Sequence, residues 1–337
     1  MTDSSFPTFV HSYLDNLYIK GRKASTIKRY EHDFSLFFRW LSQQTKGRTI
    51  ESEWMNITKE QVQQFITYLF EEKEHQIRTV RRIHSALKQL AKYCIEENFC
   101  KEHPFAFSGA PELILTPLKP SEWVSSQEVS QFIQTLRSNK NLSEQQLEVR
   151  PLLKARNEFI VKLFLHYGLT LQEAVDLTMT QMKFESGTIE INGEADKRSI
   201  HLSQPDRQLA FSYYQKIPEP VRPRLHENDP FLVAFDFQRK TYRWSYEEDK
   251  PKQLTNIAIQ KMIRLEVARG ELRKGISAQH LRNRYILHAL LQGELTENVQ
   301  KKLGLKSPLS FHRYVLTIDK LTEEQRHDLL QQYGRKD

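Results

Sequence analysis

The sequence has few of the features that mark metal-bound, secreted or membrane-spanning proteins. Its two cysteines are Cys94 and Cys100, and their spacing fits no set of zinc ligands. The longest apolar runs, such as ILHALL, are far too short to cross a bilayer. The N-terminal segment also lacks the basic-then-apolar order of a signal peptide. We therefore expect a cytoplasmic protein with reduced thiols, no membrane contact, no metal and no cofactor.

The composition fits a folded protein with an excess of positive charge. The chain has 337 residues, 39% hydrophobic and 27% charged, which excludes wholesale disorder and leaves room for two cores. Its net charge is +8, and residues 20–30 and 76–92 each hold five Lys or Arg and no acidic residue. One such block is usually a solvated helix face. Two of them on helical patterns favour contact with phosphates.

Residues 6–100 have the apolar periodicity of amphipathic helices, and they predict a four-helix domain over residues 1–106. We expect one of these helices to begin with Ser25 as its N-cap, and another to begin with the capping box of Thr58 and Gln61. The proline-rich stretch that follows predicts a linker over residues 107–124.

A second domain is expected over residues 125–337, opening with the capping box of Ser125 and Glu128. Its helical segments include ARNEFIVKLFLHYG and LQEAVDLTMTQM, and three more helical patterns occupy 255–270, 279–292 and 321–333. GTIEINGEADKRSIHL alternates on either side of NGEAD and predicts a β-hairpin. Residues 205–253 give no clear pattern. The fold class is therefore mainly α with a small β-sheet, an α+β protein.

The order of these parts resembles the tyrosine recombinase (phage integrase) family over nearly the whole chain. The first domain resembles the family's SAM-like core-binding domain, through YLDNLYIKGRKASTIKRYEHDFSLFFRWL and TVRRIHSALKQLAKYCIEENFCKEHPF. The second resembles its catalytic-type domain, through RNEFIVKLFLHYGLTLQEAVDL, INGEADKRSIHL, SAQHLRNRYILHALLQG and LGLKSPLSFHRY. Each pattern is loose, but four of them in the correct order predict the fold.

The resemblance implies a specific chemistry. In the family a tyrosine attacks a DNA phosphate, two arginines clamp the non-bridging oxygens, a hairpin lysine protonates the leaving oxygen, and histidines or similar groups handle protons. This chain keeps Tyr314 and Arg282 at the family positions. The other four family positions hold residues without that chemistry: Thr170 for the first arginine, Glu194 for the lysine, and Gln279 and Leu305 for the proton-handling groups.

These departures predict a degenerate site. Loss of one preorganised donor commonly costs about 10²–10³ in rate, and here several are replaced together. Lys197, His280 and His312 lie near the altered positions, but none replaces an arginine at Thr170. A protein that binds without cutting would act by occupancy, as a transcriptional regulator or repressor of phage or mobile-element type. The alternative is an active site-specific recombinase that cuts through Tyr314.

The partner implied by the resemblance is double-stranded DNA. A third hypothesis is a homo-oligomer formed through the C-terminal helix KLTEEQRHDLLQQY. Tyr314 and Arg282 also have structural alternatives, as a buried aromatic and as the partner of a carboxylate. Basic and hydroxyl residues predicted to contact DNA are Lys23, Ser25, Thr26, Lys28, Arg29, Arg78, Arg81, Arg82, Lys88 and Lys92 in the first domain, and Lys197, Arg198 and Arg284 in the second.

Overall fold

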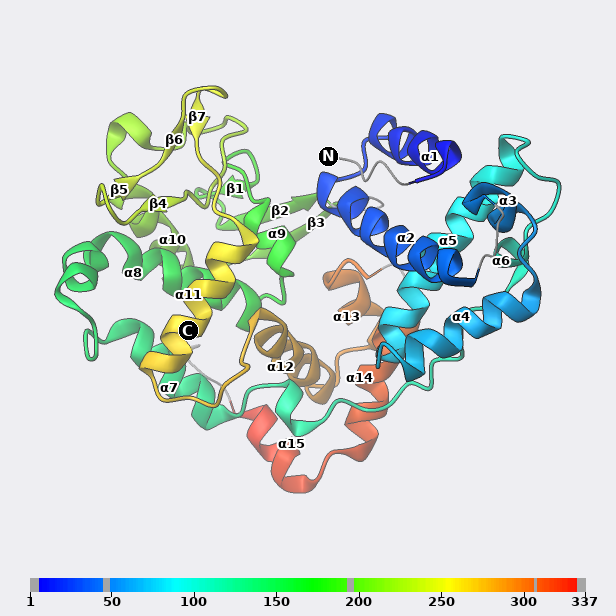
Figure 1. Cartoon of the computed structure of the whole chain (residues 1–337). Coiled ribbons are helices and arrows are strands. Elements are labelled where there is room, and N and C mark those ends of the chain that lie inside the picture. The colour runs from blue at the N-terminus through cyan, green and yellow to red at the C-terminus, as the bar shows by residue number, and fades with distance from the viewer. Residues whose placement is uncertain (1–5, 45–48, 193–196, 306–307, 332–337) are drawn as a thin grey trace. The chain divides into compact units, whose positions relative to one another are not determined.

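A computed structural model describes residues 6–44, 49–192, 197–305 and 308–331. The chain divides into two compact units, Met1–Ile114 and Leu115–Asp337, shown in Figure 1. No helix among these residues is both long enough and apolar enough to span a membrane.

The first unit is helical and surrounds an aromatic core. Its helices are α1 (Thr8–Ile19), α2 (Ala24–Gln44), α3 (Ile50–Met55), α4 (Lys59–Glu71), α5 (Ile77–Glu96) and α6 (Pro104–Phe107). Phe9, Phe37, Trp54 and Phe65 are buried where α1 to α4 meet, and Phe37 packs edge-on against Phe65 and Trp54. Large rings placed at helical spacing thus hold several helices around one core.

Of the two helix caps predicted in this unit, the structure confirms one. The capping box at the start of α4 is confirmed, because Thr58 and Gln61 each accept a hydrogen bond from the other's backbone N–H. The prediction that Ser25 caps α2 is wrong, because the helix already begins at Ala24 and Ser25 lies within its first turn. The short helix α3, which carries the buried Trp54, was not expected.

The second unit combines eleven helical segments with three small antiparallel sheets in the part of the chain that the structure describes. Its helices are η1 (Pro120–Glu122), α7 (Ser126–Arg137), α8 (Glu144–Leu165), α9 (Leu171–Val175), α10 (Gln204–Lys216), η2 (Glu219–Val221), α11 (Asn256–Arg269), α12 (Ala278–Leu291), α13 (Thr296–Lys302), α14 (Pro308–Lys320) and α15 (Glu323–Leu330). Its strands are β1 (Met182–Lys183), β2 (Thr188–Asn192), β3 (Lys197–His201), β4 (Phe235–Asp236), β5 (Thr241–Tyr242), β6 (Trp244–Ser245) and β7 (Lys250–Pro251).

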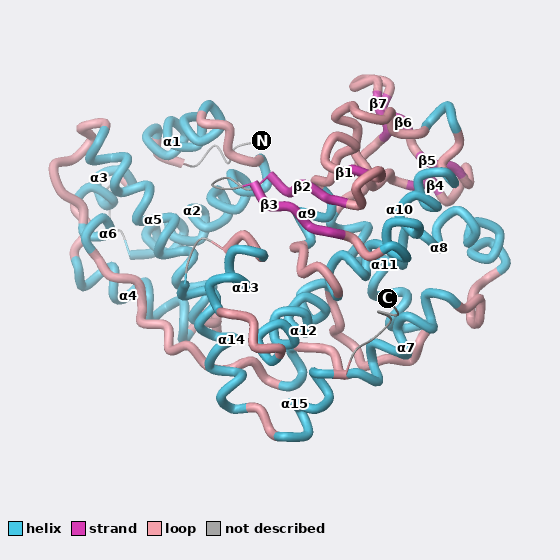
Figure 2. The backbone as a smooth tube through the Cα atoms, turned by 180° about the vertical axis from the view of Figure 1, so that it is seen from behind, coloured by secondary structure: helices cyan, strands magenta, loops and turns pink. Residues whose placement is uncertain are grey.

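The sheets pair in the orders β1-β2-β3, β4-β5 and β6-β7, and they appear as short magenta segments in Figure 2. The predicted hairpin is confirmed by the pairing of β2 with β3, in which Ile191 lies opposite Arg198. The capping box of Ser125 and Glu128 is also confirmed at the start of α7. Residues 205–253, which show no clear sequence pattern, contain most of α10 and the two smaller sheets.

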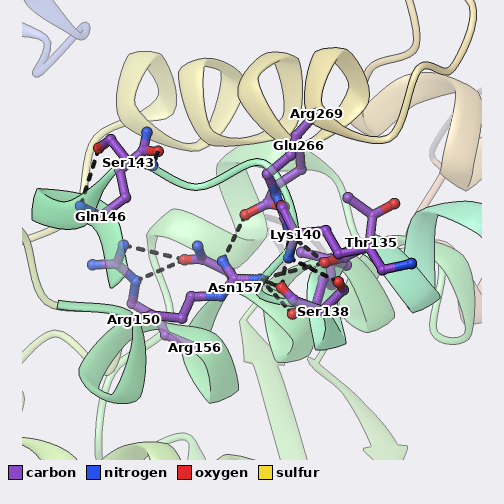
Figure 3. A network of polar contacts seen from close by, with 11 residues as sticks. Thr135, Ser138, Lys140, Ser143, Gln146, Arg150, Arg156, Asn157, Glu266 and Arg269 are labelled. Atoms are coloured by element: carbon purple, nitrogen blue, oxygen red, sulfur yellow. Dashed lines mark hydrogen bonds and ion pairs between the residues drawn. The ribbon is translucent and has the colours of Figure 1, made fainter. Parts of the chain in front are cut away.

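Helix α8 is central to the second unit and packs against α7, α10 and α12. Near its N-terminal half, Arg150 donates to Glu266 of α11 at 2.8 Å, and Arg269 also pairs with Glu266 (Figure 3). Both arginines donate to main-chain carbonyls at the end of α7, including that of Ser138. The last carbonyls of a helix lack the hydrogen bonds of its interior, so the arginines supply donors at the end of α7 and join α7, α8 and α11.

The structure differs from the expected linker over residues 107–124. Leu118 and Trp123 are buried in the second unit, and the Leu118 N–H donates to Thr317 of α14 at 2.8 Å. Arg313 of α14 donates to the carbonyl of Thr116 at 2.9 Å. Residues 116–123 are therefore part of the second unit, and they hold the helix that carries Tyr314.

The C-terminal helix also packs within its own unit. Leu329 of α15 is fully buried, and Asp328 accepts hydrogen bonds from Ser126 of α7 and Arg284 of α12. Burial of this helix accounts for Arg284, which was predicted to contact phosphate. The oligomer predicted through the C-terminal helix stays a prediction, and residues 332–337 lie outside the described part of the chain.

Candidate active site

Tyr314 lies on α14 with its hydroxyl turned toward α12. Its side chain is 9% exposed, and the hydroxyl donates to Asn283 Oδ1 at 2.7 Å. Gln279 Nε2 donates to the same Asn283 oxygen at 2.7 Å and to the Tyr314 hydroxyl oxygen at 3.4 Å. Asn283 is itself fixed, because its Nδ2 donates to the carbonyl of Glu122 at 2.6 Å. The hydroxyl proton is thus held by an amide oxygen, which is not a base.

The electrostatic setting of Tyr314 favours its neutral form. Burial raises the pKa of the hydroxyl, and the positive charges of Arg282 and Arg313 only partly oppose this. A nucleophilic tyrosine must lose its proton as it attacks, so it needs a base or a lowered pKa. The described surroundings of Tyr314 supply neither.

Arg282, the retained arginine, is 7% exposed and binds main-chain oxygens. Its Nε donates to Gly168 O at 2.7 Å, and its Nη2 makes a longer contact of 3.5 Å with Leu303 O. Gly168 has a φ of +65°, and a Cβ there would lie 2.4 Å from the Tyr285 ring. The glycine therefore permits both the turn and the close packing that bring its carbonyl to Arg282. Arg282 is at least partly a structural residue.

Thr170, at the family position of the first arginine, caps helix α9. The Thr170 N–H donates to Glu173 Oε2 at 2.7 Å, and the Glu173 N–H donates to Thr170 Oγ1 at 3.1 Å. Glu173 also pairs with Arg198 of β3 at 2.7 Å. A threonine N-cap typically contributes about 1 kcal/mol to stability. The residue that replaces the arginine is thus used to start a helix and carries no positive charge.

The other altered positions are equally poor in cations and proton donors. Leu305 is half-buried and packs against the core around α12 and α14. Glu194 lies outside the described residues. Of the neighbouring groups, Lys197 and His312 are exposed, and His280 lies 2.7 Å from the Ser277 hydroxyl through its Nδ1. Burial lowers the pKa of His280. None of the described neighbours takes the place of the missing arginine at Thr170.

Asn283 is the residue at this site that the sequence analysis missed. It lies four residues after Gln279 and directly after Arg282, so the helical period does place it beside Gln279. The signal was therefore present in QHLRN. Its partner Tyr314 is 31 residues away in sequence, and that contact could not be read from the sequence.

The basic residues of the first unit fall into two groups. Exposed members are Lys23, Lys28 and Arg29 near the start of α2 and Arg78 and Lys92 on α5, with Ser25 exposed and Thr26 half-buried. On α5 the residues 78, 81, 82, 88 and 92 recur at helical spacing and share one face. This face is opposite the apolar stripe that contains Val80, Ile83 and Leu87.

Three residues of the same face have protein partners. Arg82 pairs with the fully buried Asp33, Arg81 donates to the carbonyl of Pro111, and Lys88 donates to the carbonyl of Ser108 at 2.9 Å. These contacts stabilise the unit, whatever else the residues bind. In the second unit the prediction for Arg284 is wrong, because it is buried and donates to Val124 O and to Asp328.

Comparison with known proteins agrees with this architecture. Residues 10–98 match the model of the phage integrase N-terminal SAM-like domain. The fold is similar to XerH site-specific recombinase bound to difH substrate, with a TM-score of 0.60 and 19% identity over 90% of this chain and 81% of that chain. It is also similar to a lambda integrase dimer bound to a COC' core site, with a TM-score of 0.58 and 12% identity over 94% and 97% of the two chains. The chain therefore has the tyrosine recombinase fold.

Sequence relatives make the assignment more specific. The tyrosine recombinase XerC of Chlamydia caviae is 26% identical over 96% of this chain and 98% of the relative. The tyrosine recombinase XerC of Oceanobacillus iheyensis is 23% identical over 94% and 93% of the two chains. The match of residues 10–98 and the relatives that align over nearly the whole chain support the tyrosine recombinase family. The predicted family and the predicted α+β fold, with a SAM-like N-terminal domain, are confirmed.

Proposed function

We propose that this protein binds duplex DNA through both units and acts by occupying its site without cutting it. Its output would be transcriptional regulation, as a repressor of phage or mobile-element type. The observation that carries this proposal is the state of Tyr314, whose hydroxyl is buried and hydrogen-bonded to the amide oxygen of Asn283. The occupants of the other family positions support it, because Thr170 caps a helix and Leu305 packs in a core.

The DNA-binding part of the proposal rests on two kinds of support. The structural neighbours XerH, lambda integrase and Tn1549 integrase are each described in complexes with DNA. The exposed residues Arg78 and Lys92 lie on the basic face of α5, which has no acidic residue before Glu96 at the end of the helix, and Lys28 and Arg29 are exposed on α2. Such residues would give an affinity that falls steeply with salt, because phosphate contacts release counterions.

A second candidate function is site-specific recombination through Tyr314. It is favoured by the relatives, which are tyrosine recombinases and match this chain over nearly its whole length. Under this alternative, binding to DNA would have to rebuild the site by drawing the Tyr314 hydroxyl away from Asn283 and supplying a base. Such tightening on substrate binding is common in enzymes.

A map of the genomic sites that the protein occupies would test the proposal. Occupied sites at promoters, with expression of the adjacent genes rising when the protein is removed, are the expected result. An attachment-like core flanked by inverted arms, with recombinant junctions in cells that contain the protein, would support the recombinase instead. Tyr314→Phe is the matched control. If the protein acts without using the tyrosine as a nucleophile, this variant should leave both occupancy and repression unchanged.

A further inference from the structure

The guanidinium group of Arg198 is mostly buried, and two of its donors have no acceptor among the described residues. Its side chain is 9% exposed, and its Nη1 pairs with Glu173 at 2.7 Å. Its Nε and Nη2 are buried and have no hydrogen-bond acceptor among the described residues. These two atoms form one edge of the guanidinium group, the edge that binds two oxygens of a phosphate side by side. A buried charged donor without an acceptor is unfavourable unless a ligand satisfies it.

Arg198 lies against the turn that connects α13 to the tyrosine segment. A Cβ placed on Gly304 would be 2.7 Å from Arg198 Nη1, so the guanidinium is in contact with the backbone of this turn. The preceding residue of the turn, Leu303, provides a carbonyl contact to Arg282. The following residue is Leu305, nine residues before Tyr314. The hairpin strand β3 therefore carries a second arginine to the edge of the Tyr314 site.

The charges around this edge are unbalanced. Burial lowers the pKa of Arg282; Tyr314 and Glu173 oppose this, and the positive charge of Arg198 adds to it. Two buried guanidinium groups thus share the neighbourhood with the carboxylate of Glu173. Among the described residues Arg198, Arg282 and Glu173, positive charge exceeds negative charge by one, and this excess, together with the open Nε and Nη2 edge, fits an oxyanion.

We propose that Arg198 binds a DNA phosphodiester beside Tyr314, with Arg282, and supplies the cation that Thr170 lacks. The site would hold the phosphate in place without activating the tyrosine, whose hydroxyl remains on Asn283. This inference rests on the proposed function only in taking duplex DNA as the source of the phosphate. The other role open to Arg198 is a purely structural one, as the partner of Glu173.

The first experiment uses inorganic phosphate as the probe on the full-length protein. Arginine side chains are labelled with ¹⁵N, and their Nε–H signals are followed as phosphate replaces chloride at constant ionic strength. Arg198→Lys identifies the Arg198 signal and keeps the charge, but it removes the Nε–Nη2 edge. We expect the Arg198 signal to shift saturably. A signal that stays in place throughout the titration would overturn the proposal.

The second experiment uses a duplex from an occupied site and compares Arg198→Gln with Lys183→Gln. Both variants lose one positive charge, and Lys183 is exposed on β1 of the same sheet. We expect Arg198→Gln to weaken binding roughly tenfold, as for the removal of a charged hydrogen bond, and Lys183→Gln to have little effect. Equal effects of the two variants would contradict a specific phosphate contact. Thermal unfolding of each variant shows that the comparison is made on folded protein.

A methylphosphonate scan of the duplex separates a direct contact from a loss of structure. One neutralised phosphate should weaken binding by the wild type and leave binding by Arg198→Gln unchanged. If every position affects the two proteins equally, Arg198 does not contact a phosphate. The inorganic phosphate titration still reports on the site if the protein proves not to bind duplex DNA. A covalent adduct would refute the occupancy proposal and leave the phosphate result standing.

Discussion

The Tyr314 hydroxyl donates a hydrogen bond of 2.7 Å to Asn283 Oδ1, so the residue at the nucleophile position is joined to α12 by an uncharged amide. The same oxygen accepts from Gln279, and the Asn283 amide nitrogen donates to the carbonyl of Glu122. Asn283 therefore connects the tyrosine, its own helix and the segment that precedes α7. Through this network, the tyrosine at the family's nucleophile position has a structural role, because its hydroxyl helps to join α14 to α12.

Replacing Asn283 with alanine should destabilise the second unit. The change removes the acceptor of the buried Tyr314 hydroxyl and one hydrogen-bond partner each of Gln279 and the Glu122 carbonyl. An unsatisfied buried polar group costs about 1–3 kcal/mol. We expect the free energy of unfolding in urea to fall by at least this amount. Gln208→Ala, at an exposed position of α10, is the control and should have little effect. An Asn283→Ala variant as stable as the wild type would show that the network contributes nothing.

Alkaline titration should show Tyr314 ionising late. Because its pKa is raised in the folded state, the stability that it contributes is fully present below the pKa of an unfolded tyrosine, about 10, and is lost as the pH rises through the folded value. The difference in tyrosinate absorbance between the wild type and Tyr314→Phe should therefore appear above that pH. Ionisation of Tyr314 at or below the ordinary tyrosine value would indicate an activated nucleophile.

Duplex binding should depend on the exposed basic face of α5. We expect Arg78→Glu with Lys92→Glu to weaken binding at least tenfold and to flatten its salt dependence, with the slope reduced by roughly one unit for each phosphate that the protein no longer neutralises. Arg81 and Arg82 are less suitable for this test, because a glutamate at Arg82 would face the buried Asp33 and disturb the fold.

Lys59→Glu with Lys101→Glu is the matched control for this pair of changes. Both lysines are exposed in the same unit, on or near other helices, and the change in charge is identical. An equal loss of affinity in both double variants would mean that net charge alone attracts the DNA. Unaltered retardation by the α5 variant would refute the proposed interface.

The charged network of Arg150, Glu266 and Arg269 should be essential for stability. All three side chains are less than 10% exposed, and Glu266→Gln would leave two buried cations without their carboxylate (Figure 3). We expect the free energy of unfolding to fall by about 3–5 kcal/mol. Glu148→Gln removes the partner of Lys240 in an exposed pair and should cost less than about 1 kcal/mol. Similar losses in the two variants would contradict this account.

Local signals predicted much of the fold. The capping boxes at Thr58 and Ser125 and the pairing of β2 with β3 depend on residues that are close in sequence, so the sequence contains what is needed to predict them. Helix α13 was missed, because its seven residues bury only Val299 and show no extended apolar stripe. The burial of Leu118 and Trp123 was also missed, since a proline-rich segment shows no period that would indicate a packed face.

Long-range partners explain the errors at the site. Arg82 and Arg284 are of a residue type that often contacts phosphate, and both were predicted to do so. Each instead pairs with a carboxylate that is distant in sequence: Asp33 lies 49 residues from Arg82, and Asp328 lies 44 residues from Arg284. Only the folded chain shows that a basic residue is already paired. The absence of an arginine at Thr170 was readable from the sequence, whereas its use as a helix cap required the structure.

The most direct test of the central claim is a covalent trap on nicked duplex DNA that contains an occupied site. A cutting recombinase would lose the short fragment beyond the nick and accumulate as a 3′-phosphotyrosine adduct on Tyr314. We predict that the wild type retards this DNA as strongly as Tyr314→Phe does and that neither forms an adduct stable to denaturation. An adduct formed by the wild type and lost in Tyr314→Phe would contradict the proposal and establish the protein as a recombinase.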